Sequence, residues 1–555
     1  MRYLVFFTWL CCLISTAFAQ DKYWISFTDK GDLSQAQRTV ALSPEALANR
    51  AVLGIPLDET DYAVNPAYLT GIMESAQVKV LRTSRWFNAA SANLTFEQYQ
   101  QIDALPYVAD ITPVRSHSTT LKMGMTDECP ETPYVGTAAR QLTMLKLDRL
   151  HANGLTGKGV RVAVFDNGYY RVDSLEAFEH IFEENRIVGA YDFVDNDDDV
   201  FNSCVHCKHG TYVFSILAAR MPDVLIGSAP DAEFILLRTE NDYSETHQEE
   251  DNWIAAAEYA DSLGARIFTT SLGYYDFDEG EGDYFNSDLD GQTARITIAA
   301  DIAASKGIVV VNSAGNAGSR GLNAPADGFD VLAIGAVDAC TDIAGFSSRG
   351  PTADGRVKPD LVAMGSGNFF LDPSGSVRTG GGTSFSCPII SGLTACMLQA
   401  APEAPRALIY DALKSSADRF EDPDNSYGYG LPDAVTATQA LFEGGFARGA
   451  SGQLLDPSLG YGHPFPQERM VVYPNPSAGD IHLAFESPRA RFPALIEMYD
   501  LTGRLVWSRQ EEISNDNLMV RIPAARTTGI FMLQVVDEET GARILTRNVS
   551  FTLSR

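Results

Sequence analysis

The chain has 555 residues, which is too many for one ordinary domain, and its 45% hydrophobic content is typical of packed globular units. Its 72 acidic and 42 basic residues give a formal net charge of −30, which repels polyanions and excludes nucleic acid as the expected partner. We expect two or three folded domains.

Residues 1–19 have the pattern of a secretory signal peptide. Arg2 supplies a short basic start, an apolar run covers Leu4 to Ile14, and Ala17-Phe18-Ala19 has the small-x-small form of a cleavage site. The apolar run is shorter than the ~20 residues that a membrane span requires, and no later apolar stretch reaches that length. We therefore expect an exported protein whose mature form is soluble.

Residues 20–118 predict a small α+β unit. Strand-like and helical segments alternate here at Tyr23 to Phe27, Pro44 to Val52, Val78 to Thr83, Thr95 to Ile102 and Val108 to Val114. In residues 119–141 the periodicity fades and Gly, Pro, Thr and acidic residues increase. This composition predicts an exposed linker that is open to proteolysis.

Residues 142–443 predict an α/β domain with a largely parallel sheet. Apolar runs that do not alternate with polar residues are typical of strands buried on both faces, and here they are separated by helical patterns. The runs include Val160 to Phe165, Phe234 to Leu237, Ile267 to Thr270 and Ile308 to Val311; the helical patterns include Trp253 to Leu263 and Thr293 to Ser305.

Residues 444–468 are rich in Gly, Pro and Ser and predict a second linker. Residues 469–555 then show short strand-like runs joined by turn signals, which predicts a small β-sandwich. The runs are Met470 to Tyr473, Ile481 to Phe485, Ala494 to Tyr499, Leu518 to Ile522, Ile530 to Val535 and Val549 to Leu553.

Four segments of the α/β domain carry residues suited to nucleophilic catalysis. Asp166 follows a buried strand, His209 precedes an apolar helix, Ser384 precedes a helix of small and apolar residues, and Asn316 lies in a Gly-flanked turn after a strand. Reactive residues collect where parallel strands end and helices begin. Ser384 is placed at a helix N-terminus, where the helix dipole and the free backbone N–H groups stabilise developing negative charge. Taken singly, the four also fit a turn aspartate, a surface histidine, a helix-capping serine and a turn asparagine.

Together and in this order, the four segments resemble the signature set of the subtilases, over roughly Leu142 to Val435. The resemblance implies a triad of Asp166, His209 and Ser384. It also implies that Asn316 is an oxyanion donor and that Ser271, Leu272 and Gly273 bind the substrate backbone. Lys358-Pro359-Asp360 resembles another recurrent segment of the family.

Two residues depart from the usual subtilase pattern. Asn167 stands where Ser or Thr is common, and Phe385 where Met is common. Asn167 can still donate a hydrogen bond to Asp166, and Phe385 keeps an apolar residue behind the nucleophile. We therefore expect an active secreted serine endopeptidase that hydrolyses proteins or peptides through an acyl-enzyme, as a monomer without a required cofactor.

The flanking units carry resemblances of their own. Residues 20–118 resemble a subtilase propeptide, a folding aid and inhibitor, and we expect self-cleavage between about Val114 and Tyr134. The C-terminal segment resembles the sorting domain of the type IX secretion system of Bacteroidota, which implies contact with that machinery and a place in the medium or at the surface of a Gram-negative cell. The segments that carry this second resemblance are Val472-Tyr473-Pro474-Asn475-Pro476, Tyr499 to Arg504 and Gly529-Ile530-Phe531. A carbohydrate- or protein-binding β-module is the alternative.

The cysteines and one group of aspartates are candidate ligands for zinc and for calcium. Cys204-Val205-His206-Cys207 has the spacing of half a zinc site, but no second ligand pair follows, so a local disulfide or free thiols is favoured. The six cysteines beyond the signal peptide allow 15 pairings, among which spacing does not choose. An acidic cluster suggests a structural calcium, although no Gly completes an EF-hand turn, so a solvated loop is favoured. The cluster consists of Asp192, Asp195, Asp197, Asp198 and Asp199.

Other functional classes fit less well. A lipase-like hydrolase needs a G-x-S-x-G setting and the order Ser, Asp, His, which this chain lacks. Gly157-Lys158-Gly159 precedes a strand instead of following one, which argues against a dinucleotide site. A surface adhesin on an inactive subtilase scaffold is the remaining alternative, and the presence of all four chemical residues argues against it.

Overall fold

The computed structural model describes residues 21–31, 40, 42–114, 138–222, 224–278, 281–443 and seven strands between residues 469 and 551. The expected signal peptide, residues 119–137 of the first linker and all of the second linker lie outside these residues. Across the described part of the chain, no helix is both long enough and apolar enough to cross a membrane.

The N-terminal unit is a four-stranded antiparallel sheet in the order β2-β3-β1-β4, packed against helices. Its core contains Ile25, Ile72, Leu94 and Ile102. The elements are β1 (Asp21–Phe27), α2 (Pro44–Leu53), the 3-10 turn η2 (Glu59–Asp61), α3 (Pro66–Ala76), β2 (Val80–Ser84), β3 (Ala89–Leu94), α4 (Phe96–Asp103) and β4 (Val108–Pro113). The predicted α+β class is therefore observed. The sequence did not predict α3 or β3, because Gly71 weakens the helical pattern and the small residues of β3 carry little strand signal.

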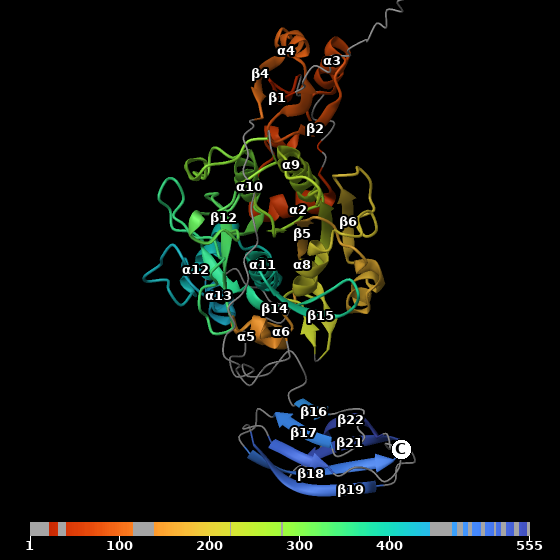
Figure 1. Cartoon of the computed structure of the whole chain (residues 1–555). Helices are drawn as coiled ribbons and strands as arrows, with labels where there is room; N and C mark the ends of the chain where they lie inside the picture. The colour runs from red at the N-terminus through yellow and green to blue at the C-terminus, as the bar shows by residue number, and fades with distance from the viewer. Residues whose placement is uncertain are drawn as a thin grey trace, which may run out of the picture.

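The N-terminal unit lies on two helices of the central domain, α9 (His247–Ser262) and α10 (Arg295–Ser305) (Figure 1). Two arginines of this unit, Arg50 and Arg85, contact the Asp261 carboxylate at 2.8 and 2.7 Å, and all three side chains are buried. The Trp24 indole donates to Asp251 at 2.8 Å. Because a buried charge that loses its partner is strongly unfavourable, these pairs specify how the unit sits.

The central domain contains a seven-stranded sheet in the order β13-β12-β11-β10-β5-β9-β6, and every pairing in it is parallel. The strands are β5 (Arg161–Asp166), β6 (Ile187–Asp192), β9 (Glu233–Arg238), β10 (Ile267–Thr270), β11 (Val309–Ser313), β12 (Val331–Val337) and β13 (Leu361–Met364). Nearly all residues of these strands except those of β6 are buried, which explains the non-alternating apolar runs of the sequence. The predicted largely parallel α/β domain is confirmed.

Helices cover both faces of this sheet. Val162 and Val164 of β5 pack into the core beneath α8 (His209–Ala218) and α11 (Thr383–Ala400), whereas Ala163 and Phe165 pack beneath α9 and α10. The remaining elements are α5 (Ala139–Thr143), α6 (Leu147–Ala152), η3 (Val172–Ser174), η4 (Glu176–Phe178), α7 (Glu179–Glu183), β7 (Arg220–Met221), β8 (Leu225–Ile226), η5 (Asn286–Asp288), η6 (Gly318–Arg320), β14 (Ser366–Leu371), β15 (Val377–Gly381), α12 (Arg406–Ser415) and α13 (Ala434–Glu443).

The strand order changes direction at β5, which lies between β9 and β10. In open parallel sheets the carboxyl ends of the strands at such a switch point form the usual reactive crevice. Asp166 ends β5, and residues 271–273 follow β10 directly. The topology therefore brings the predicted substrate strand next to the predicted catalytic carboxylate.

The C-terminal strands form two antiparallel sheets, with the orders β16-β17-β20 and β19-β18-β21-β22. Two such sheets agree with the predicted β-sandwich. The strands are β16 (Arg469–Tyr473), β17 (Ile481–Glu486), β18 (Arg491–Asp500), β19 (Leu505–Ser514), β20 (Leu518–Ile522), β21 (Gly529–Asp537) and β22 (Arg543–Phe551). The sequence did not predict β19, whose Arg509, Gln510, Glu511 and Glu512 interrupt the apolar pattern.

Candidate active site

Asp166 and His209 meet at the carboxyl end of β5. The Asp166 side chain is fully buried, and its Oδ1 lies 2.8 Å from Nδ1 of His209, the first residue of α8. The backbone N–H of Asn167 donates to the same oxygen at 2.8 Å. Because Nδ1 faces the carboxylate, the other ring nitrogen, Nε2, is left to exchange a proton.

This contact depends on the close approach of α8 to the turn after β5. A Cβ atom on Gly210 would lie 2.3 Å from the carbonyl oxygen of Gly168, a distance that atoms in real structures do not adopt. The Thr211 hydroxyl donates to the Tyr170 carbonyl at 2.9 Å and ties the same two segments. Glycine at position 210 is therefore required for His209 to reach Asp166.

The side chain of Asn167 does not serve Asp166 as the sequence analysis expected. Its Nδ2 donates to Asp242 at 2.7 Å, and its Oδ1 accepts the Gly210 N–H at 3.2 Å. Only the backbone of Asn167 donates to Asp166. Among the described residues, Oδ2 of Asp166 is buried without a hydrogen-bond partner.

Ser384 is the second residue of α11, and Pro388 lies in the second turn of the helix. A proline at that position cannot donate to the Ser384 carbonyl four residues earlier. The Ser271 hydroxyl donates to that carbonyl at 2.9 Å instead, and the Ser384 hydroxyl donates to the Ser271 carbonyl at 3.1 Å. The nucleophile candidate is thus anchored to the predicted substrate strand.

The His209 ring also faces the start of α11. Its centroid lies 6.3 Å from that of Phe385, and the two rings are close to parallel, with an angle of 18° between their planes. Phe385 directly follows Ser384, so the imidazole lies near the helix turn that carries the serine, whose hydroxyl itself donates to the Ser271 carbonyl.

Asn316 is exposed and its amide is oriented by Thr383. Its Oδ1 accepts from the Thr383 backbone N–H at 2.9 Å and from the Thr383 hydroxyl at 3.1 Å, which turns Nδ2 away from these donors. A Cβ atom built on Gly382 would lie 3.7 Å from this Nδ2 and 3.8 Å from the Ser384 backbone nitrogen. Oδ1 of the same amide lies 3.9 Å from that point, so the Asn316 side chain and the Ser384 backbone nitrogen both border Gly382.

The segment Ser271, Leu272 and Gly273 is fixed by side chains that the sequence analysis did not identify. The Asn312 amide and the Ser313 hydroxyl donate to the Leu272 carbonyl at 3.2 and 3.3 Å. The Asn323 amide donates to the Gly273 carbonyl at 3.1 Å. Asn312 and Ser313 end β11, just before the turn that contains Asn316, whereas Asn323 carried no sequence signal.

Acidic neighbours control the protonation of His209. Burial lowers the pKa of its imidazole, but the Asp166 charge and hydrogen bond and the charges of Asp242 and Glu240 outweigh burial, so the pKa is raised above 6.5. Burial also raises the pKa of Glu240 to about 7, and the Tyr274 hydroxyl donates to this carboxylate at 2.6 Å.

The Cys204 and Cys207 sulfurs and an Asp242 carboxylate oxygen lie within 4.8 Å of one another. Cys204 and Cys207 are joined in a disulfide, which is one of the interpretations that the spacing left open. Cys340 is also disulfide-bonded, and Cys387 and Cys396 are buried free thiols. In the acidic cluster, Arg238 contacts Asp192 and Asp195 at 2.6 and 2.7 Å and so neutralises part of the charge that would attract calcium. The calcium hypothesis stays a prediction.

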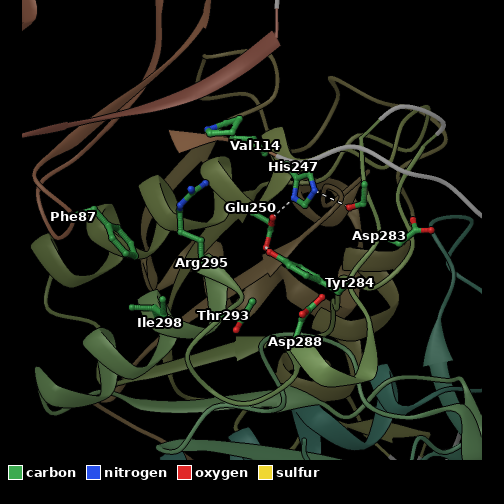
Figure 2. Close-up of a pocket in the computed structure, with 12 residues that line it drawn as sticks. Phe87, Val114, His247, Glu250, Asp283, Tyr284, Asp288, Thr293, Arg295 and Ile298 are labelled. Atoms are coloured by element: carbon green, nitrogen blue, oxygen red, sulfur yellow. Dashed lines mark hydrogen bonds and ion pairs between the residues drawn. The ribbon is translucent and has the colours of Figure 1, made fainter. Parts of the chain in front are cut away.

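A separate cavity of about 290 Å³ lies where the N-terminal unit meets α9 and α10 (Figure 2). Phe87 and Val114 border it from the N-terminal unit, and His247, Glu250 and Arg295 from the two helices. The His247 Nε2 lies 2.9 Å from the Gly282 carbonyl, and the Tyr284 hydroxyl donates to Glu250 at 2.9 Å. None of the four candidate catalytic residues lines this cavity.

Comparisons with known proteins match three segments of the chain. A model of the "Subtilase family" matches residues 157–430, a model of the "Peptidase S8 propeptide domain, Bacteroidota" matches residues 22–127, and one of the "Secretion system C-terminal sorting domain" matches residues 471–545. Serine protease AprX of Bacillus subtilis is 31% identical over 59% of this chain and 77% of its own length. The chain belongs to the subtilase family. It is a subtilisin-like serine protease with an S8 propeptide domain and a type IX secretion sorting domain.

Further relatives cover different shares of the chain. Subtilisin E of Bacillus subtilis is 27% identical over 69% of this chain and 88% of its own length. The membrane-bound transcription factor site-1 protease of Mus musculus is 30% identical over 54% of this chain and 26% of its own length. Among solved structures, MycP1 with its N-terminal propeptide removed covers 54% of this chain and 96% of its own, at 23% identity and a TM-score of 0.43.

The Ser271 hydroxyl gives a prediction for stability. Ser271→Ala leaves the buried Ser384 carbonyl without a donor, and we expect it to lower the free energy of unfolding by about 1–3 kcal/mol. The measurement is urea denaturation of chains that also carry Ser384→Ala, which retains the carbonyl and prevents self-digestion. Adding Pro388→Ala restores a backbone N–H in the helix, so the loss caused by Ser271→Ala should be smaller in that background. An equal loss in both backgrounds would contradict the assigned role.

Proposed function

We propose that this protease hydrolyses peptide bonds of exported or extracellular proteins with Asp166, His209 and Ser384 as its triad. The observation that carries the proposal is the 2.8 Å contact between Asp166 and His209, with the imidazole facing the first turn of α11. In this proposal the Ser384 hydroxyl leaves the Ser271 carbonyl, to which it donates at 3.1 Å, and hydrogen-bonds to Nε2 of His209 when substrate is attacked. The order of the triad in the chain, Asp, His and Ser, is that of the subtilases.

Each residue has a distinct chemical task in this mechanism. Ser384 attacks the scissile carbonyl while His209 accepts its proton, and His209 then donates that proton to the leaving amine. Asp166 orients the imidazole and stabilises its charged form. The Asn316 amide and the Ser384 backbone N–H receive the oxyanion of the tetrahedral intermediate, and water then hydrolyses the acyl-enzyme.

The flanking units fit a protease that is kept inactive until it is exported. The N-terminal unit covers α9 through buried ion pairs, and in this proposal it is a propeptide that the mature domain cleaves between about Val114 and Tyr134. The C-terminal unit is the address for the type IX machinery, and the enzyme ends in the medium or on the surface of a Gram-negative cell.

Active-site substitutions test the catalytic assignment. Ser384→Ala should abolish hydrolysis and labelling by a fluorophosphonate probe, and its propeptide should stay uncut when the variant is purified alone. Asn316→Ala should keep the label but lower kcat by about 10²–10³, the magnitude known for removal of one oxyanion donor from the family member subtilisin. Labelling of Ser384→Ala equal to wild type would reject the serine assignment, and absence of labelling from both would favour the inactive adhesin.

The electrostatics of His209 predict the pH dependence. The general base must be neutral to accept a proton, and the acidic neighbours raise its pKa above 6.5. kcat/KM should therefore fall as pH decreases through a midpoint above 6.5, measured with an uncharged peptide substrate at constant ionic strength. A midpoint below 6.5 would mean that burial outweighs the carboxylates.

Deletion of Glu468 and all later residues tests the export route. In a Bacteroidota host with a working type IX system, the full chain should reach the medium or cell surface, and the truncated chain should accumulate in the periplasm, as followed by immunoblotting of cell fractions. The Ser384→Ala chain serves as the control that separates export from activity. Unchanged export of the truncated chain would favour the carbohydrate- or protein-binding module instead.

A further inference from the structure

The departure at Asn167 creates a hydrogen-bond bridge that links three segments of the active site. Asn167 belongs to the turn after β5, its Oδ1 accepts from Gly210 in α8, and its Nδ2 donates to Asp242 in the loop after β9. Its side chain is 8% exposed, so water reaches little of it, whereas Asp242 is exposed. Both the nitrogen and the oxygen of the Asn167 amide are therefore hydrogen-bonded to protein groups.

The direction of the Asn167 amide is decided by Asp242. A carboxylate is only an acceptor, so it selects the NH₂ end of the amide and leaves the oxygen to face Gly210. Gly210 directly follows His209, and the same Asn167 residue donates its backbone N–H to Asp166. Loss of the Asp242 acceptor would leave Asn167 free to rotate and would loosen α8 against the Asp166 turn.

We propose that Asn167 and Asp242 are positioning residues that hold the His209 imidazole against the Asp166 carboxylate. The inference rests on the proposed triad. It assigns to the β9–α9 loop a function in the orientation of the general base.

Asp242 also acts on His209 through its charge. Three carboxylates interact electrostatically with the imidazole: Asp166 at the end of β5, and Glu240 and Asp242 in the loop after β9. The side of the ring that faces α11 meets the uncharged Phe385 ring. Each of the three carboxylates favours the protonated form of His209 when it is ionised, and Glu240, whose pKa is raised to about 7, is only partly ionised near that pH. Removal of the Asp242 charge should therefore lower the pKa of His209 and shift the acid limb of kcat/KM to lower pH.

Two substitutions separate the hydrogen bond from the charge. Asp242→Asn removes the charge but keeps an oxygen for Asn167, and Asp242→Ala removes both. We expect both variants to move the acid limb to lower pH. Only Asp242→Ala should also lower kcat, on the order of tenfold with KM nearly unchanged, because small displacements of a catalytic group are costly. Asp422→Asn, which removes an exposed carboxylate from the loop after α12, is the matched control and should change neither quantity.

A second background shows whether Asp242 acts through Asn167. Asn167→Ser returns the hydroxyl that is usual in the family and ends the contact with Asp242, so Asp242→Ala should then cause no further loss of kcat. Equal losses of kcat in the parent and in the Asn167→Ser background, or no loss in either, would overturn the positioning role.

The pKa of His209 can be measured without catalysis. In Ser384→Ala protein, the NMR titration of the His209 ring should show a lower pKa for both Asp242 variants than for the parent. An unchanged pKa together with an unchanged acid limb would overturn the electrostatic part of the inference. If instead the pKa responds but the Ser384 parent hydrolyses no peptide, the proposed function fails while the contact among Asp242, Asn167 and His209 stands.

Discussion

The active site depends on the contact between the first turn of α8 and the turn after β5. Gly210 lacks the Cβ atom that would lie 2.3 Å from the Gly168 carbonyl, so the helix begins close enough for His209 to reach Asp166. Every later step of the proposed mechanism requires this distance, because the imidazole can accept a proton from serine only if the carboxylate orients it. Asn167 and Asp242 then hold the two segments at that separation.

The parallel sheet supplies the second half of the site. The carboxyl ends of β5, β10 and β11 lie at one edge, and residues that follow these strands face the N-terminal turn of α11. Pro388 removes a helix hydrogen bond from the Ser384 carbonyl, and Ser271 replaces it. The hydrogen bond that α11 lacks at Pro388 is thus replaced by one that joins Ser384 to the segment on which the substrate backbone is expected to lie.

Ion pairs and acidic residues act at two further places in the molecule, the contact with the N-terminal unit and the surroundings of His209. The N-terminal unit places Arg50 and Arg85 against Asp261 of α9, and these ion pairs are shielded from solvent as long as the unit stays bound. In the proposed mature enzyme the same carboxylate would be exposed and would add to the acidic surface expected from the net charge of −30. Acidic residues also surround His209, where they raise the pKa of the general base.

Local patterns in the sequence were enough to predict the α/β class and the candidate residues Asp166, His209, Ser384 and Asn316, because buried parallel strands and the motifs at their ends are each contained in a short stretch of chain. They did not identify α3, β3 or β19. Gly71 weakens the helical pattern of α3, the small residues of β3 carry little strand signal, and polar residues interrupt the apolar pattern of β19. The folded molecule was needed to show that Asn167 bonds to Asp242, that Ser271 replaces the helix bond lost at Pro388, and that Asn323 fixes Gly273. These contacts join residues from different elements, and their geometry follows from how the elements pack and not from any local pattern.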